Sequence, residues 1–173
     1  VWEFRTEVSG GSGELVGGDA IRLGTHHSYD VGLGDIDDDG DLDAIVTNWE
    51  YQGNRIWVND DGQFTDSGQI LGREESRRLA LGDLDGDGDL DVFIANVTAN
   101  RVWLNDGGVF RDSGQLLGAL HSVGVGLGDF DGDGDLDAVM ATTIRVEPAG
   151  STGENRIWLN SGDGTFTDSG QLL

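Results

Sequence analysis

Short runs of apolar and β-branched residues alternate along the chain with clusters of Asp, Gly and Asn. In the first third of the chain this pattern predicts four strands, at residues 30–34, 43–48, 55–59 and 63–70. Val, Ile, Trp, Phe and Thr are frequent in these runs, as is typical of β-strands. No window of ten residues has the spacing of an amphipathic helix. The pattern therefore predicts an all-β chain.

The same pattern recurs twice more, so the chain is a repeat array. The motif Gly-Asp-x-Asp-x-Asp-Gly-Asp-Leu-Asp has its first Asp after the Gly at residues 35, 83 and 129, which are intervals of 48 and 46 residues. Each copy is followed by Asn-Arg-Ile/Val-Trp, and then by a Phe and Asp-Ser-Gly-Gln. Four short strands in a period of about 40–50 residues are typical of a β-propeller blade.

We therefore predict one structural domain that contains three four-stranded blades, at residues 25–72, 73–118 and 119–173. Residues 1–24 lack the aspartate motif, but Trp2, Phe4 and residues 21–24 loosely resemble the third and fourth strands of a repeat. We expect them to form a partial blade or closing strands. Three repeats fall below the roughly 4–8 blades that close a ring. An open arc, a fragment of a longer propeller and a ring completed by oligomerisation are all compatible with this count, as is a small monomeric ring with a degenerate fourth blade.

One Trp occupies the same place in each repeat, directly after the Asn-Arg pair: Trp57, Trp103 and Trp158. Recurrence at a shared scaffold position favours packing between blades over stacking on a carbohydrate.

The composition narrows the possible partners. The chain has 33 Asp and Glu residues against 10 Lys and Arg, and its net charge is -23. Such a field repels nucleic acid phosphates and anionic lipid headgroups, so we expect no nucleic acid partner. No apolar run approaches the roughly 18 residues of a membrane span, so we expect no membrane insertion. The absence of Cys excludes disulfides and thiolate metal sites.

The repeated aspartates have the spacing of residues that wrap around a cation. Counted from Asp35 as position 1, carboxylates stand at positions 1, 3, 5, 7 and 9, and Gly40 stands at position 6. Ca²⁺ takes roughly 6–8 oxygen ligands, and glycine permits the sharp turn. A solvated acidic turn is the alternative, but it explains three copies poorly because so many adjacent carboxylates repel each other.

Two other cation sites fit the sequence less well. An EF-hand needs Glu at position 12, where this chain has Val46, Ile94 and Met140. Mg²⁺ demands near-ideal octahedral geometry and keeps its waters, so a cage of many carboxylates favours the larger Ca²⁺. We therefore expect about three Ca²⁺ ions, held by the aspartates of the three motifs: Asp35, Asp37, Asp39, Asp41, Asp43, Asp83, Asp85, Asp87, Asp89, Asp91, Asp129, Asp131, Asp133, Asp135 and Asp137.

These motifs, with their Asn-Arg-x-Trp and Phe-x-Asp-Ser-Gly-Gln segments, resemble FG-GAP/VCBS repeats over about residues 25–173. The resemblance implies blades like those of the integrin α-subunit propeller, in which the loop between the first two strands of a blade binds Ca²⁺. It implies side-chain ligands at positions 1, 3, 5 and 9 and backbone carbonyl ligands at position 7. It also implies a secreted or cell-surface location. Family propellers have about seven blades, and this chain has three repeats.

The loops opposite the aspartate motifs are candidates for ligand binding. In an up-and-down blade, the loops that follow strands one and three lie at one rim, and the loops that follow strands two and four lie at the other. The second rim would carry Trp49, Tyr51, His26 and His27, together with His121 and the variable segment 144–154. Loops on a rigid scaffold commonly carry recognition, although an ordinary surface insertion is equally compatible with this variation.

Two classes of function remain open from the sequence. The first is a calcium-stabilised scaffold for adhesion or for binding a protein or glycan ligand, without catalysis of its own. The second is a module of a secreted carbohydrate-active enzyme. The aspartates stand in three equivalent settings, whereas a glycosidase needs one pair of carboxylates in unlike environments, so the sequence favours the binding scaffold.

Overall fold

The computed structural model describes residues 23–118, 121–143 and 153–173. In this part of the chain, all regular structure is β, and each repeat forms one four-stranded antiparallel sheet whose strands follow the chain order. The first sheet contains β1 (Ser28–Gly34), β2 (Asp43–Asn48), β3 (Asn54–Asp60) and β4 (Gln63–Leu71). The second contains β5 (Ser76–Gly82), β6 (Asp91–Asn96), β7 (Arg101–Leu104) and β8 (Arg111–Asp112). The third contains β9 (Ser122–Gly128), β10 (Asp137–Thr142), β11 (Arg156–Asn160) and β12 (Phe166–Leu172).

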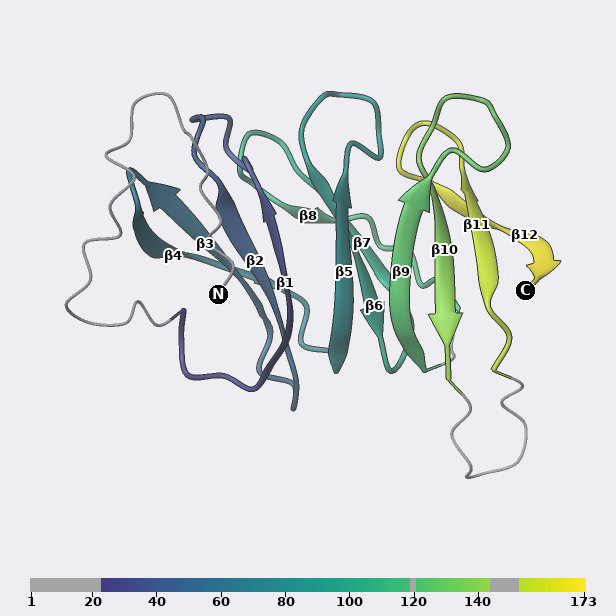
Figure 1. Cartoon of the computed structure of the whole chain (residues 1–173), viewed down its shortest axis with the longest axis horizontal. Helices are drawn as coiled ribbons and strands as arrows, with labels where there is room; N and C mark the ends of the chain where they lie inside the picture. Colours follow the sequence, from purple (N-terminus) through teal and green to yellow (C-terminus); the bar gives the residue numbers. More distant parts are fainter. Residues whose placement is uncertain (1–22, 119–120, 144–152) are drawn as a thin grey trace, which may run out of the picture.

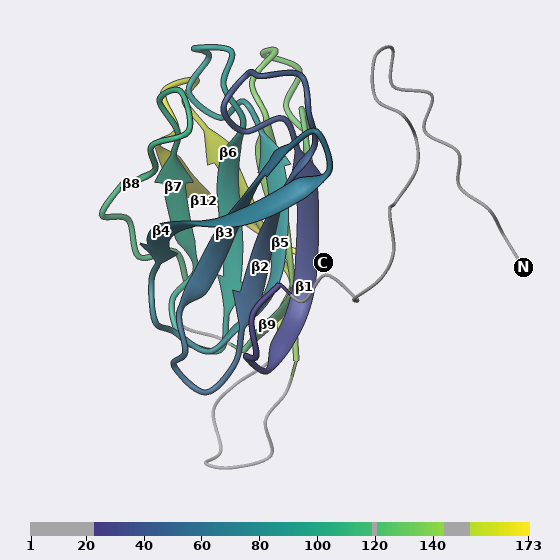
Figure 2. The ribbon, with the colours of Figure 1, turned by 90° about the vertical axis from the view of Figure 1, so that its left-hand side faces the viewer.

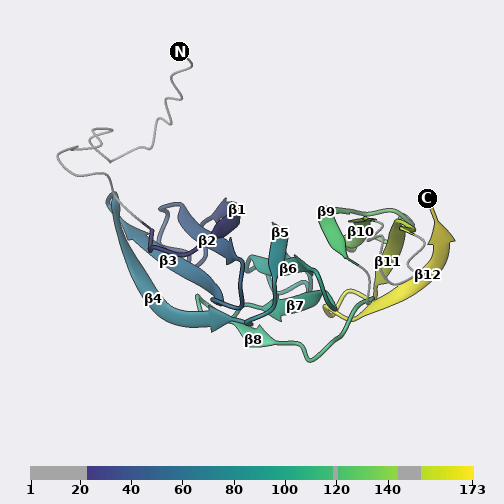
Figure 3. The ribbon, with the colours of Figure 1, turned by 90° about the horizontal axis from the view of Figure 1, so that it is seen from below.

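The three sheets stand side by side in chain order (Figure 1). Seen from below they form an open arc, with β1, β5 and β9 along its inner side and β4, β8 and β12 along its outer side (Figure 3). The inner strands contact one another from sheet to sheet. This arrangement confirms the predicted all-β fold of propeller-type blades. The four strands predicted in the first repeat also agree with β1–β4 to within two residues at each end.

The hydrophobic core lies between the sheets rather than within any one of them. One cluster joins Ile45 and Ile56 of the first sheet to Ile94 and Phe110 of the second. A second cluster joins the second sheet to the third, where the rings of Phe93 and Phe166 meet edge to face with centroids 5.3 Å apart. Because each blade buries its apolar side chains only against its neighbours, the array is stabilised from repeat to repeat.

Two of the three recurring Trp residues contribute to these clusters, as the sequence predicts. Trp158 is buried in the cluster between the second and third sheets, and Trp103 packs against the cluster between the first and second. Trp57 lies close to Gly24, at the start of the described chain.

The Asp-Ser-Gly-Gln motif forms a bulge that joins adjacent sheets. In β4 the register shifts between Asp66 and Ile70, opposite Trp57 and Arg55, which leaves the intervening residues outside the regular ladder. Gln69 in this bulge accepts a hydrogen bond from the Phe110 N–H at 3.0 Å and donates one to the Gly108 carbonyl at 2.7 Å.

The second sheet repeats this connection to the third. Gln115 accepts a hydrogen bond from the Phe166 N–H at 2.7 Å and donates one to the Gly164 carbonyl at 2.7 Å. The motif is therefore a polar connection from each blade to the next.

The predicted partial blade at residues 1–24 lies almost entirely outside the described residues, as does most of the segment 144–154. No helix capable of crossing a bilayer occurs in the part of the chain that the structure describes.

Candidate metal centres and the opposite rim

Each aspartate motif forms the turn between the first two strands of its sheet. The carboxylate at position 1 accepts a hydrogen bond at 3.1 Å from the N–H of the glycine at position 6 in all three copies, which closes the turn on itself. The three glycines have φ of 96°, 100° and 102°, a conformation that side chains disfavour: Gly40, Gly88 and Gly134. The glycine predicted for the sharp turn is therefore required by the backbone.

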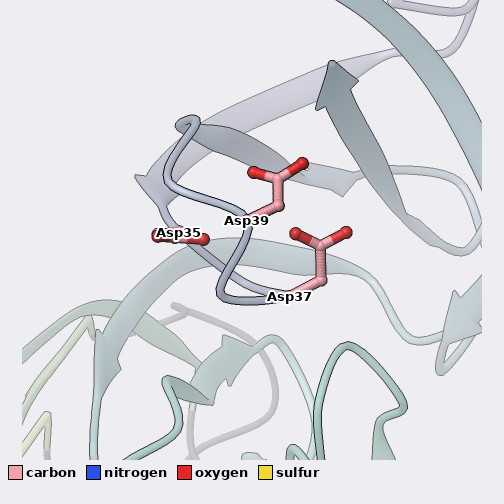
Figure 4. Close-up of side chains that lie close together, drawn as sticks. All are labelled: Asp35, Asp37 and Asp39. Carbon is pink, nitrogen blue, oxygen red and sulfur yellow. The ribbon is translucent and has the colours of Figure 1, made fainter. Parts of the chain in front are cut away.

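These turns gather three carboxylates in each repeat, with candidate ligand oxygens all within 4.8 Å of one another. In the first turn the group consists of Asp35, Asp37 and Asp39, which Figure 4 shows projecting from the turn between β1 and β2. In the other turns the groups are Asp83, Asp85 and Asp91, and Asp129, Asp131 and Asp137. Positions 1 and 3 thus occur in every group, whereas position 5 joins only the first and position 9 only the second and third.

The aspartate at position 9 is fully buried at the start of the second strand of each sheet. Both oxygens of Asp91 accept backbone hydrogen bonds at 2.7 Å, one from the Leu84 N–H in the turn and one from the Asn105 N–H at the end of the third strand. Asp43 and Asp137 bind the equivalent N–H groups in their own sheets. This side chain therefore ties the turn to the sheet in every repeat, and in the second and third turns it also brings a negative charge into the group.

Burial, and after it the neighbouring negative charges, raise the pKa values of several of these carboxyls. Burial raises the pKa of Asp91 to about 6, although two hydrogen bonds from backbone N–H groups oppose the shift. The pKa values of Asp37 and Asp85 are raised above the usual range by burial, and next by the charges of Asp43 and Asp87 respectively. The ionised form of these carboxyls is therefore disfavoured, and a bound cation would stabilise it.

Two oxygens of the first turn are buried without any hydrogen-bond partner in the described structure, namely Oδ1 of Asp35 and Oδ1 of Asp37. A buried carboxylate oxygen that lacks a partner is costly unless another group satisfies it. Because both oxygens belong to the same three-carboxylate group, the residues present fit an oxygen-coordinated cation such as Ca²⁺.

The aspartate at position 7 has a further role that the sequence did not reveal. The Asp41 carboxylate accepts a hydrogen bond at 2.7 Å from the Asp61 N–H, and Asp89 accepts one at 2.7 Å from the Gly107 N–H. Both donors lie in the turn between the third and fourth strands of their sheet. The side chain thus connects the two turns at this rim and leaves its own carbonyl for the ligand role that the resemblance implies.

The aspartate turns lie along one edge of the arc, at the top of Figure 1, and the loops that join β2 to β3 and β6 to β7 lie along the opposite edge. At this opposite rim the structure brings His27, Trp49 and Tyr51 into one loop cluster. The Trp49 N–H donates to the His27 carbonyl at 2.7 Å, and the Nδ1 of His27 lies 3.2 Å from Oε2 of Glu50. Tyr51 is 63% exposed. His26, the chain neighbour of His27, is partly buried and lies beside Gly24.

Two residues that the sequence reasoning did not select complete this rim. The rings of Trp49 and Tyr29 lie 5.2 Å apart, and the Arg77 guanidinium lies over both, 4.8 Å from the centroid of Trp49 and 5.5 Å from that of Tyr29. Tyr29 and Arg77 each follow the first Ser of an inner strand, at an irregularity in the ladder of β1 and of β5. Their equivalent positions in the two repeats could have drawn attention to them in the sequence. Only the packing of the sheets shows that Tyr29 and Arg77 contact each other.

The turn that carries Tyr51 has an uncommon backbone. Glu50 and Tyr51 have φ of 56° and 59°, and the Gln52 N–H donates to the Trp49 carbonyl at 3.2 Å. Two central residues with positive φ are the mark of a type I′ turn, which favours Asn and Gly. A Glu-Tyr pair therefore holds this exposed ring at some conformational cost.

Comparison with known proteins was made at two levels. A search of the curated proteins gives no match. A model of the FG-GAP-like repeat matches residues 35–94 and again residues 83–140, and the two matches together span more than half of the chain. Each match begins at the first aspartate of a motif and extends into the following repeat. The structure has one propeller-type blade for each copy of this motif, and the chain belongs to the FG-GAP-like repeat family.

Proposed function

We propose that this chain is a calcium-stabilised scaffold of propeller blades that binds a protein or glycan ligand outside the cell, without catalysis of its own. The observation that carries the calcium part is the recurrence of a three-carboxylate group in each of the three turns. One such group is compatible with an ordinary acidic turn. Three groups in equivalent positions indicate a requirement that every blade shares.

The side chains at positions 1, 3, 5 and 9 of each turn would hold the ion, and position 7 would add its carbonyl. Bound Ca²⁺ would supply positive charge and take these oxygens as its ligands. The chain's own contribution is the turn closed by the position 6 glycine and the buried position 9 aspartate, which link the ion to two strands. Calcium that binds only the folded state stabilises that state by mass action.

Ligand binding is proposed for the rim opposite the turns. Tyr51 is exposed, and in the same loop region Trp49 contacts Tyr29 and Arg77 in a group that spans the first two sheets. Aromatic rings with a nearby Arg are enriched at protein interfaces, and flat rings also stack on sugars. The calcium turns would then fix the blades while the opposite rim makes contact with the ligand.

The calcium part is tested by elemental analysis and thermal melting, with calcium and with a chelator. We expect about three bound ions and a lower melting temperature after chelation. Asp85→Ala should lower the melting temperature in calcium more than Asp106→Ala, because Asp85 belongs to a carboxylate group whereas Asp106 pairs with Arg111 on the surface. A protein without bound calcium whose melting is unchanged by chelator would refute the proposal.

The ligand part is tested on a glycan array and by hydrolysis assays on the same glycans. Binding without turnover supports the scaffold, whereas turnover supports the alternative of a carbohydrate-active enzyme module. For any ligand found, Trp49→Ala together with Tyr51→Ala should abolish binding. The affinity of Tyr51→Ala alone can be compared with that of the control Val109→Ala, which removes an exposed apolar side chain from the turn after β7. Unchanged affinity in the double variant would show that the ligand binds elsewhere.

A further inference from the structure

The three sheets pack through one repeated interface, and each end of the arc presents one half of it. We call the face of a sheet toward the preceding repeat its leading face, and the face toward the following repeat its trailing face. Among the described residues, the leading face of the first sheet and the trailing face of the third have no neighbouring sheet (Figure 3). Figure 2 views the molecule from the side of this leading face.

The internal interfaces are built from leucines on a leading face and glycines on a trailing face. A Cβ added to Gly34 on β1 would lie 2.6 Å from Cδ1 of Leu90 and 3.3 Å from Cδ1 of Leu81. A Cβ added to Gly82 on β5 would lie 2.7 Å from Cδ1 of Leu136. The leucines occupy the space that a side chain would need, so glycine is required at these positions.

Polar groups repeat across the same interfaces. Asn105 donates a hydrogen bond at 2.8 Å to the Ile36 carbonyl in the preceding turn, and Asn160 donates one at 2.7 Å to the Leu84 carbonyl. The Gln69 and Gln115 side chains extend in the opposite direction, from a trailing edge to the next sheet. Each interface thus combines leucine insertion with hydrogen bonds in both directions.

The leading face of the first sheet carries the leucine half of this interface. Leu33 occupies the position of Leu81 in its repeat, and Leu42 occupies that of Leu90. Both are largely exposed, at 60% and 50%, whereas Leu81 and Leu90 pack against the core cluster between the first two sheets. Among residues 23–118, 121–143 and 153–173, no trailing face covers these apolar side chains.

The trailing face of the third sheet carries the glycine half. Gly128 occupies the position of Gly34 and Gly82, and an added Cβ there would meet only the ring of Phe130 from its own sheet. A shallow hollow on this face is bordered by Gly126 and other residues of β9 and β10, together with Leu173.

The end of the third sheet is exposed where the other two are covered. Leu173 is 67% exposed, whereas Leu71 and Leu117 at the equivalent positions are 1% and 4% exposed. Gln171, the third glutamine of the series, is also exposed, and no hydrogen bond of its side chain is present among the described residues. Within the described part of the chain, this end therefore exposes both a hydrophobic and a polar component of the interface.

We propose that the leading face of the first sheet docks on the trailing face of the third sheet in a second copy of this chain. Leu33 and Leu42 of one copy then cover Gly128 of the other. By equivalence with the internal interfaces, Gln171 donates to the Gly62 carbonyl and accepts from the Phe64 N–H.

A second copy is the occupant that the structure favours, because the same two types of face already pack together twice within the chain. This contact joins two different faces, so it is heterologous. If the leading face of each copy docks on the trailing face of the other, two copies form a closed assembly. Two copies supply twice the three described sheets, a number within the roughly 4–8 blades of known propellers. The proposal does not depend on the identity of any ligand at the rim.

Light scattering in calcium, coupled to size-exclusion chromatography, tests the proposal with the 173-residue chain. The expected mass is twice the chain mass of 18.4 kDa. Leu173→Asp and Leu33→Asp should each reduce it to that of one chain. The matched control is Leu172→Asp, because its equivalent Leu116 remains 64% exposed even though a third sheet follows. A melting curve for each variant shows that the monomer is folded.

Mixing the two monomeric variants distinguishes the proposed contact between two different faces from a symmetric contact between two identical faces. Leu33→Asp retains an intact trailing face and Leu173→Asp an intact leading face, so an equimolar mixture should recover a two-chain species. If either variant fails to fold, Gln171→Ala replaces it and should raise the dissociation constant at least tenfold in a dilution series. A folded wild-type protein with the mass of one chain would overturn the proposal, and so would variants that retain the wild-type mass.

Discussion

Asp91→Asn tests how the aspartate turns stabilise the fold, because it changes charge and hydrogen bonding with almost no change in shape. Asp91 is fully buried, and its two oxygens accept hydrogen bonds at 2.7 Å from the Leu84 and Asn105 N–H groups. An Asn side chain has one oxygen and one NH₂ group, so it can accept from only one of these donors. The other N–H then faces a second donor and has no partner.

The expected loss in the metal-free protein follows from these two bonds. A hydrogen bond to a charged group contributes about 1.5–3 kcal/mol, and a buried donor without a partner costs about 1–3 kcal/mol. Replacing the carboxylate also removes the unfavourable burial of charge that raises the pKa of Asp91 to about 6, which offsets part of this loss. We therefore expect a net decrease of about 2 kcal/mol in the free energy of unfolding.

Calcium should enlarge the effect. Asp91 lies in the carboxylate group of the second turn, so its replacement removes one of the proposed charged ligands. Each tenfold loss of calcium affinity adds about 1.4 kcal/mol to the difference when the ion is in excess.

The assay is urea unfolding of wild type and Asp91→Asn, each in excess calcium and in excess chelator. Asp106→Asn is the control, because the Asp106 side chain is exposed and forms a surface ion pair with Arg111. The reasoning would be wrong if the variant lost the same free energy in both conditions, since Asp91 would then act only through its hydrogen bonds. It would also be wrong if the metal-free loss were near zero.

Three further changes test other parts of the structure. Gln115→Ala should lower the free energy of unfolding by about 1–3 kcal/mol, because two hydrogen bonds to the third sheet are lost, whereas Gln171→Ala should not lower that of the isolated chain; equal effects in urea unfolding would contradict this role. The melting temperature of the chelated protein should fall as the pH rises through about 6, because the raised pKa of Asp91 lets the folded state bind a proton that the unfolded chain has released; a melting temperature that rises over the same pH range would contradict this. Replacing Glu50 and Tyr51 by Asn and Gly should raise the free energy of unfolding by about 1 kcal/mol, since the type I′ turn loses two strained residues, and a destabilised variant would show that the Tyr51 ring packs more than its exposure suggests.

The strands and turns of each blade can be predicted from the local sequence, because the same pattern occurs in three repeats. The strands of each blade are short and alternate with turns, so their positions depend on nearby residues. The aspartate spacing likewise predicted a turn with converging carboxylates, since a glycine at position 6 fixes the backbone locally. Antiparallel order alone then places the aspartate turns and the Trp49 loop at opposite rims.

The contacts between repeats could not be predicted from the local sequence. The contact of Arg77 with the rings of Trp49 and Tyr29 joins two sheets, and the bonds of Gln69 and Gln115 cross from one sheet to the next. These contacts depend on how the sheets are rotated and spaced, which no single repeat specifies. The local pattern determined the blades and the aspartate turns. Packing between blades decided which surfaces of the described residues are covered, because a contact between distant segments depends on the geometry of both.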